Sequence, residues 1–114
     1  MARSTVADAE DPPEGDAVPE PSLGGLLSAL SDPHRRTIFR LLAEGGEISC
    51  TGAIADLGLK ASAASHHFKV MRLAGLTDTR REGTHRYMSL RRAALDARFP
   101  GLVTALLRAM AREG

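Results

Sequence analysis

The sequence predicts one small, mainly helical domain with a single β-hairpin, and three observations lead to this fold class. The chain has 114 residues, which leaves room for one domain only. Apolar side chains recur at helical spacing in most of it, whereas strict alternation is confined to a short stretch around a Glu-Gly-Thr turn at 82–84. With three Phe, one Tyr and no Trp, the core must be aliphatic, and a core this small often needs a second subunit.

Composition excludes several classes of protein. No stretch approaches the roughly 20 apolar residues of a membrane span, and the N-terminus is acidic where a signal peptide would be basic and then apolar, so we expect a cytoplasmic protein. The single cysteine, Cys50, allows neither an intramolecular disulfide nor a zinc site with paired thiolates. There is no Gly-rich phosphate loop and no recognisable pair of catalytic carboxylates, so we do not expect an enzyme.

Charge divides the chain into two parts. Residues 1–22 carry one basic and six acidic side chains, whereas residues 23–114 carry fourteen basic and eight acidic ones. We expect 1–21 to be a disordered acidic tail and 22–112 to be the folded domain. The tail either solubilises the protein or competes with DNA for the basic domain. The positive domain suits phosphate, although an anionic membrane surface or an acidic protein would also match its charge.

Two helices are expected first. Leucines recur at helical spacing over 23–30, and Asp32-Pro33 is a typical start signal, with a side-chain acceptor before a proline at the first helical position. The second helix should end at Gly45-Gly46.

A helix, a turn and a second helix follow between residues 51 and 74. The first should run over 51–57 and end at Gly58, and the second over 62–74 and end at Gly75. Ala64, Phe68 and Met71 lie on one side of the second helix. The other side is small, polar and basic, and it suits a DNA major groove, unless it is an ordinary solvated helix face. Its residues are Ser62, Ser65, His66, Lys69 and Arg72.

The alternating stretch predicts strands over 77–81 and 85–90, joined by a tight turn. Basic side chains flank this turn, where a hairpin beside a reading helix would touch the DNA backbone or minor groove. They are Arg80, Arg81, His85 and Arg86. The alternative is a solvated, charged hairpin.

The C-terminal part predicts a short helix that ends near 99–101 and a last helix over 100–112. Its apolar stripe is wider than a small domain can cover, so with the first helix it forms a candidate two-fold interface. The interface residues are Leu23, Leu26, Leu27, Leu102, Val103, Leu106, Leu107 and Met110. The alternative is a monomer whose last helix folds back on its own domain.

Residues 27–90 carry motifs in a specific order. They are Leu30-Ser31-Asp32-Pro33-His34-Arg35-Arg36, Ile54-Ala55-Asp56-Leu57-Gly58-Leu59, Ser65-His66-His67-Phe68-Lys69-Val70-Met71, Ala74-Gly75-Leu76, Arg81-Glu82-Gly83 and Tyr87-Met88-Ser89-Leu90. In this order and spacing they resemble the ArsR/SmtB family of bacterial repressors. The resemblance implies a dimeric winged helix-turn-helix of four helices, two strands and a closing helix. It also implies first and last helices at the interface and an effector that releases the dimer from a palindromic operator.

The chain departs from the metal-sensing members of that family. Where they carry Cys-x-Cys, this chain has Ser49, Cys50 and Thr51, and where others use His on the last helix, residues 91–114 contain no histidine. Lys60 stands where the family often has a serine cap, so we expect Ser62 to cap the reading helix.

Other candidate chemistry is sparse. Cys50 is either a redox switch or buried filler. Nickel or zinc could be held by His34 or His85 with a carboxylate, whereas His66 should face outward and His67 should lie near the core as a structural residue. A protein-interaction module that uses the basic face on an acidic partner is the alternative to DNA binding.

Overall fold

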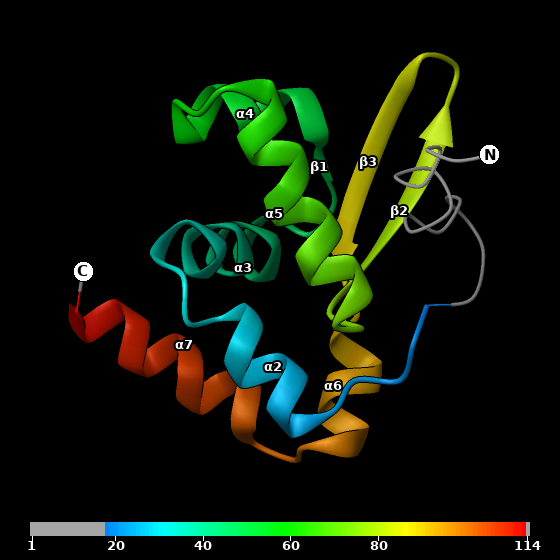
Figure 1. Ribbon diagram of the computed structural model, residues 1–114. Coiled ribbons are helices and arrows are strands. Elements are labelled where there is room, and N and C mark those ends of the chain that lie inside the picture. The colour runs from blue at the N-terminus through cyan, green and yellow to red at the C-terminus, as the bar shows by residue number, and fades with distance from the viewer. Residues whose placement is uncertain (1–17, 114) are drawn as a thin grey trace, which may run out of the picture.

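The computed structural model describes residues 18–113. Figure 1 shows a helical body from which a β-hairpin extends. The elements are α2 (Leu23–Ala29), α3 (Pro33–Gly45), β1 (Ile48–Ser49), α4 (Cys50–Leu57), α5 (Ala61–Leu73), β2 (Thr77–Glu82), β3 (His85–Leu90), α6 (Arg92–Arg98) and α7 (Leu102–Glu113). The order of helices and the hairpin predicted from the sequence are confirmed. The first 17 residues of the expected tail lie outside the described residues.

Helix ends follow the predicted signals, with one exception. The Asp32 carboxylate accepts hydrogen bonds from the amides of His34 (2.8 Å) and Arg35 (3.2 Å) and caps α3. The expectation that Ser62 caps α5 is wrong, because the helix begins at Ala61 and Ser62 already lies inside its first turn. The N-cap is Lys60, whose side chain makes no capping hydrogen bond.

The sheet has one strand more than the sequence predicted. It is antiparallel with the order β1-β3-β2, and the hairpin register runs from Thr77 opposite Leu90 to Glu82 opposite His85. Strand β1 pairs only Ile48 with Met88 and Ser49 with Tyr87. Two residues are too few to show an alternating pattern, so β1 was not visible in the sequence.

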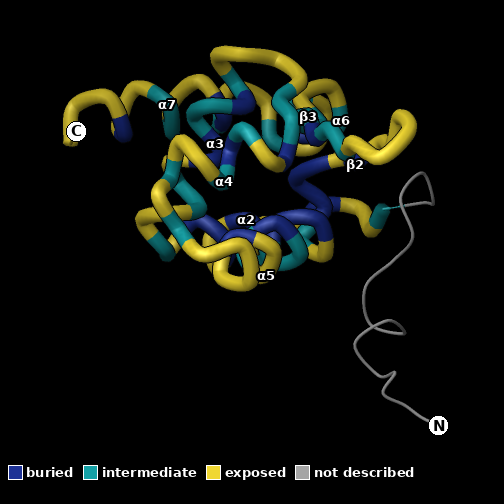
Figure 2. The backbone as a smooth tube through the Cα atoms, turned by 90° about the horizontal axis from the view of Figure 1, so that it is seen from above, coloured by how far each residue is buried: buried dark blue, intermediate teal, exposed yellow. Residues whose placement is uncertain are grey.

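The core lies around α3, and Figure 1 shows α2, α6 and α7 on one side of it and α4, α5 and the sheet on the other. Figure 2 shows the buried segments in the interior of the helical body and the exposed tip of the β2–β3 hairpin. Three of the eight predicted interface residues belong to this core: Leu26 and Val103 are fully buried, and Met110 is 7% exposed. For Leu26 and Val103 the prediction is wrong, because α2 and α7 bury one face within their own chain, whereas Met110 also lines a groove between these two helices. Leu23 and Leu27 remain about half exposed, at 51% and 53%.

The residues just before α2 are held against the domain. Pro21 is buried, and Arg91 donates from Nη1 to the carbonyls of Pro19 (3.0 Å) and Gly75 (3.1 Å). Residues 18–21 thus form an anchored strap, although the sequence placed them in the disordered tail. Order begins before the expected boundary at residue 22.

Candidate nucleic-acid interface

Helix α5 has the two faces expected of a reading helix. Ala64, Phe68 and Met71 are buried against the core. Ser62, Ser65 and His66 are exposed, and Lys69 is half-buried. The amphipathic pattern predicted from the sequence is confirmed for these residues, while their contact with DNA stays a prediction.

Arg72 does not lie on the exposed face, and that part of the prediction is wrong. It follows Phe68 by four residues, one helical turn, and therefore sits over the buried side of α5. Only 6% of Arg72 is exposed, and it lines a small cavity of about 30 Å³ between α4, α5 and the hairpin. Burial, with a smaller contribution from Arg86, lowers the pKa of Arg72.

The hairpin, which we call the wing (residues 77–90), splits its basic side chains between two faces. Arg81 lies opposite Arg86, and both alternate in phase with the buried Thr79 and Met88. Arg86 lines the same small cavity as Ser65, so this face of the wing meets α5. Arg80 alternates onto the opposite face, away from α5. The sequence treated these residues as one cluster, which the strand alternation does not permit.

Arg80 makes several contacts on that opposite face. Its guanidinium donates from Nε to Glu47 Oε2 (2.7 Å), from Nη2 to Glu47 Oε1 (2.8 Å) and from Nη1 to Glu82 Oε1 (2.7 Å). It also lies 4.7 Å from the centroid of the Tyr87 ring. The hydrogen bonds from Arg80 lower the pKa of Glu47, and those to Glu47 and Glu82 raise the pKa of Arg80. Sequence reasoning missed Glu47, because only the three-stranded register brings it to Arg80.

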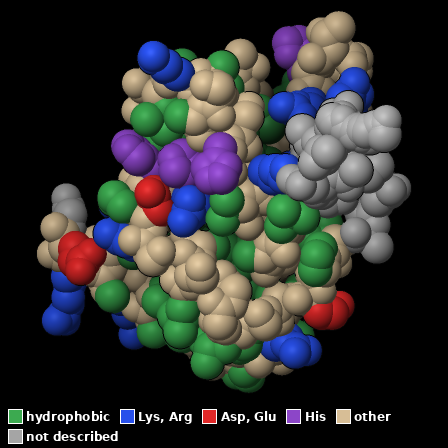
Figure 3. Space-filling view, in the orientation of Figure 1, with side chains coloured by type: hydrophobic (Ala, Val, Ile, Leu, Met, Phe, Trp, Pro, Cys, Tyr) green, Lys and Arg blue, Asp and Glu red, His purple; other side chains and the backbone are tan. Residues whose placement is uncertain are grey.

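Histidines gather where α3 passes α5 (Figure 3). The His67 ring centroid lies 5.6 Å from that of His34 and 5.9 Å from that of His66, and Arg35 Nη1 is 3.2 Å from His67 Nδ1. Burial lowers the pKa of His67, and the Asp32 carboxylate opposes this shift. Between residues 18 and 113 no three His, Cys, Asp or Glu side chains are grouped so that they could hold a metal ion.

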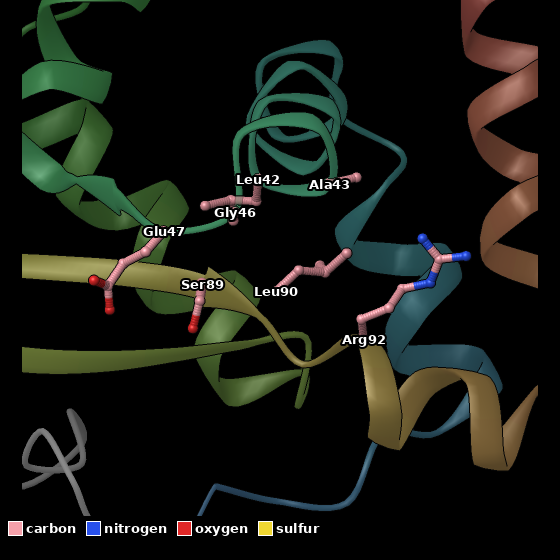
Figure 4. A pocket seen from close by; sticks show the side chains of 7 residues that line it. All are labelled: Leu42, Ala43, Gly46, Glu47, Ser89, Leu90 and Arg92. Atoms are coloured by element: carbon pink, nitrogen blue, oxygen red, sulfur yellow. The ribbon is translucent and has the colours of Figure 1, made fainter.

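Cys50 is buried at the first turn of α4, as expected of a filler residue, and its redox role stays untested. A larger cavity, of about 270 Å³, lies between the end of α3 and the junction of β3 with α6. It is lined by Leu42, Ala43, Gly46, Glu47, Ser89, Leu90 and Arg92. Figure 4 shows Glu47 and Arg92 at its opposite ends, with Leu90 between them.

None of the helices in the described part of the chain is long and apolar enough to cross a membrane.

Comparisons with known proteins agree with this geometry. The model of a helix-turn-helix domain family matches residues 30–80. An HTH-type transcriptional regulator of Bacillus subtilis, YceK, is 38% identical over 82 residues, which cover 71% of this chain and 82% of that protein. A fragment of a possible ArsR-family regulator from Mycobacterium bovis, solved as a homodimeric winged helix-turn-helix domain, has a TM-score of 0.63 at 27% identity, covering 80% of this chain and 79% of that one.

The chain belongs to the ArsR-type winged helix-turn-helix transcriptional regulators. HlyU from Vibrio cholerae shares the same fold, with a TM-score of 0.61 at 27% identity over 77% of this chain and 86% of that one. The family resemblance drawn from the sequence is therefore confirmed. This ArsR-type protein is a DNA-binding transcriptional regulator, and its family is one of regulators rather than enzymes.

Proposed function

We propose that this regulator acts as a homodimeric repressor on a palindromic operator, under the control of an effector. The observation that carries the proposal is the exposed, polar and basic face of α5 beside the wing. Ser62, Ser65 and His66 stand near the N-terminal half of α5, where small side chains let a helix approach base edges. Lys69 and the exposed Arg81 are the proposed phosphate contacts.

The remaining predicted contacts have other proposed roles. His85 lies at the tip of the wing, next to the turn, where it can reach the minor groove or backbone. Arg86 lies deeper, between the wing and α5, and together with the buried Arg72 it contributes positive potential beneath the proposed DNA surface.

The homodimer is proposed from the apolar surface shared by α2 and α7. Leu23 and Leu27 are exposed on α2, and Leu102, Leu106 and Leu107 are only half-buried on α7. A groove of about 320 Å³ runs between the two helices. A two-fold axis at this surface would pair two copies of α5, and a palindromic operator offers two half-sites with the same symmetry.

The effector is proposed to be a small molecule rather than a metal ion. No metal-holding group of side chains occurs between residues 18 and 113, whereas the 270 Å³ cavity is lined by both aliphatic and polar side chains. Glu47 lines this cavity and also holds Arg80 of the wing, so an occupant would be linked to the DNA-binding side of the molecule. We place the protein in the cytoplasm, where its operator would be.

The test is binding of the full chain to the DNA upstream of its own gene, with a scrambled duplex of equal length as control. We expect preference for the upstream fragment, strong weakening with salt, and no dependence on added nickel or zinc. Equal binding to both duplexes at every salt concentration would contradict specific DNA recognition and would direct attention to an acidic protein partner.

A further inference from the structure

The contact between Glu47 and Arg80 joins two parts of the chain that are 33 residues apart. Glu47 belongs to the connection between α3 and β1, and Arg80 belongs to the wing. The pairing is bidentate, with two parallel N–H to O contacts of 2.7 and 2.8 Å. This geometry orients both side chains, because two parallel hydrogen bonds fix a planar guanidinium relative to a carboxylate more closely than one hydrogen bond does.

The position of this contact in the sheet gives it a mechanical role. Ser49, Tyr87 and Arg80 lie side by side across the three strands, and β1 ends at Ser49. Beyond this point the wing continues as two strands only, from Arg81 opposite Arg86 to Glu82 opposite His85. A free two-stranded ribbon is flexible and marginally stable in water. The Glu47–Arg80 pair therefore holds the wing where it loses its third strand.

The same position separates Arg80 from the proposed DNA surface. Its side chain is on the sheet face opposite α5, and each of its three guanidinium nitrogens donates to a carboxylate. A phosphate would have to displace these partners to bind Arg80.

We propose that Glu47 is a positioning residue for DNA binding: through Arg80 it fixes the angle of the wing relative to α5 without touching DNA itself. The inference rests on the proposed function, in which α5 and the wing engage the same duplex. It also removes Arg80 from the set of phosphate contacts that the sequence predicted.

The experiment compares Glu47→Gln, Arg80→Gln and the double variant. Glu47→Gln removes a negative charge, so electrostatics alone predicts tighter DNA binding, whereas loss of positioning predicts weaker binding. We expect each single variant to weaken binding to the upstream duplex about two- to fivefold, the range of an exposed ion pair. The double variant should be no weaker than the singles, since both break the same contact.

Besides the affinity for DNA, the experiment measures two further properties and includes two control variants. Amide hydrogen exchange in the free protein should become faster at residues 80–87 in all three variants and stay unchanged in α5. The salt dependence of DNA binding should not change in Arg80→Gln. Arg98→Gln, which removes an exposed positive charge on α6, controls for net charge, and Arg81→Gln controls for loss of a phosphate contact.

Tighter binding by Glu47→Gln, or a salt slope reduced by about 1.8 in the Arg80→Gln dimer, about 0.9 for each subunit, would overturn the inference and make Arg80 a direct phosphate contact. Unchanged wing exchange would overturn it as well. If the unmodified protein shows no preference for the upstream duplex, the proposed function fails, whereas the exchange measurement still shows whether Glu47 holds the wing.

Discussion

At the scale of single residues, Gly75 is needed for two reasons: its backbone conformation disfavours a side chain, and neighbouring backbone atoms leave no space for one. Its φ of +81° lies in the left-handed region, where side chains are strained. A Cβ at this position would also lie 2.5 Å from the carbonyl oxygen of Pro19 and 2.9 Å from the nitrogen of Pro21. The sequence identified Gly75 as a helix stop, but it could not show the strap that crosses it, because residues 18–21 carry no periodic pattern.

Gly75→Ala should therefore destabilise the domain more than an alanine at a glycine with the same backbone but open surroundings. Gly58 is the matched control, with a φ of +67° and open space within 4 Å of the point that an alanine methyl group would occupy. Urea unfolding should show a loss of about 1 kcal/mol for Gly58→Ala and clearly more, about 2–4 kcal/mol, for Gly75→Ala. Equal losses would mean that the strap does not constrain Gly75.

Asp32 gives a prediction for pH. Burial raises its pKa, but the amide hydrogen bonds of Arg35 and His34 and the nearby His67 and Arg35 charges outweigh this and lower it overall. A carboxyl with a lowered folded pKa stabilises the protein above its unfolded value, and this contribution is lost as pH falls through the folded value. The stability advantage of the native protein over Asp32→Asn should hold from pH 7 to about 5 and shrink below about 4. A difference that stays constant down to pH 3 would show that the charge contributes nothing.

At the scale of elements, periodicity predicted the helices well and failed where an element is short or lies at a boundary. Helices α3, α4 and α5 were predicted nearly to the residue, because their caps and glycines are local signals. Strand β1 has two residues and therefore shows no alternating pattern. Arg72 lies at the edge of the polar face of α5, where the 100° rotation between successive helical residues separates an exposed position from a buried one. The apolar faces of α2 and α7 were recognised, but sequence alone could not divide them between the core and an interface.

This division predicts different roles for neighbouring leucines. Leu27→Glu should yield a monomer in sedimentation at micromolar concentration and weaken operator binding about tenfold or more, since Leu27 is 53% exposed on the proposed interface. Ala55→Glu is the control: this alanine is exposed on α4, which lies on the opposite side of α3 from both interface helices (Figure 1). If both variants have the same oligomeric state, the interface lies elsewhere.

At the scale of the whole molecule, the function follows from the unequal distribution of charge between the acidic N-terminal residues and the basic domain. Most of the basic side chains belong to residues 23–114, and the fold places those of α5 and the wing next to each other. Composition predicted an anionic partner but did not identify it. Membership in a family of transcriptional regulators identifies this partner as DNA. The operator sequence and the effector depend on side-chain detail that no periodic pattern contains.

The central claim, that the outer face of α5 binds DNA, is tested most directly by the salt dependence of operator binding in Lys69→Gln and Arg108→Gln. Both variants remove one positive charge, but Arg108 lies exposed on α7. Because the proposed dimer carries two copies of Lys69, we expect the slope of log K against log salt to become about 1.8 less steep in Lys69→Gln, about 0.9 for each subunit, and not to change in Arg108→Gln. Identical slopes in the two variants and the native protein would contradict it.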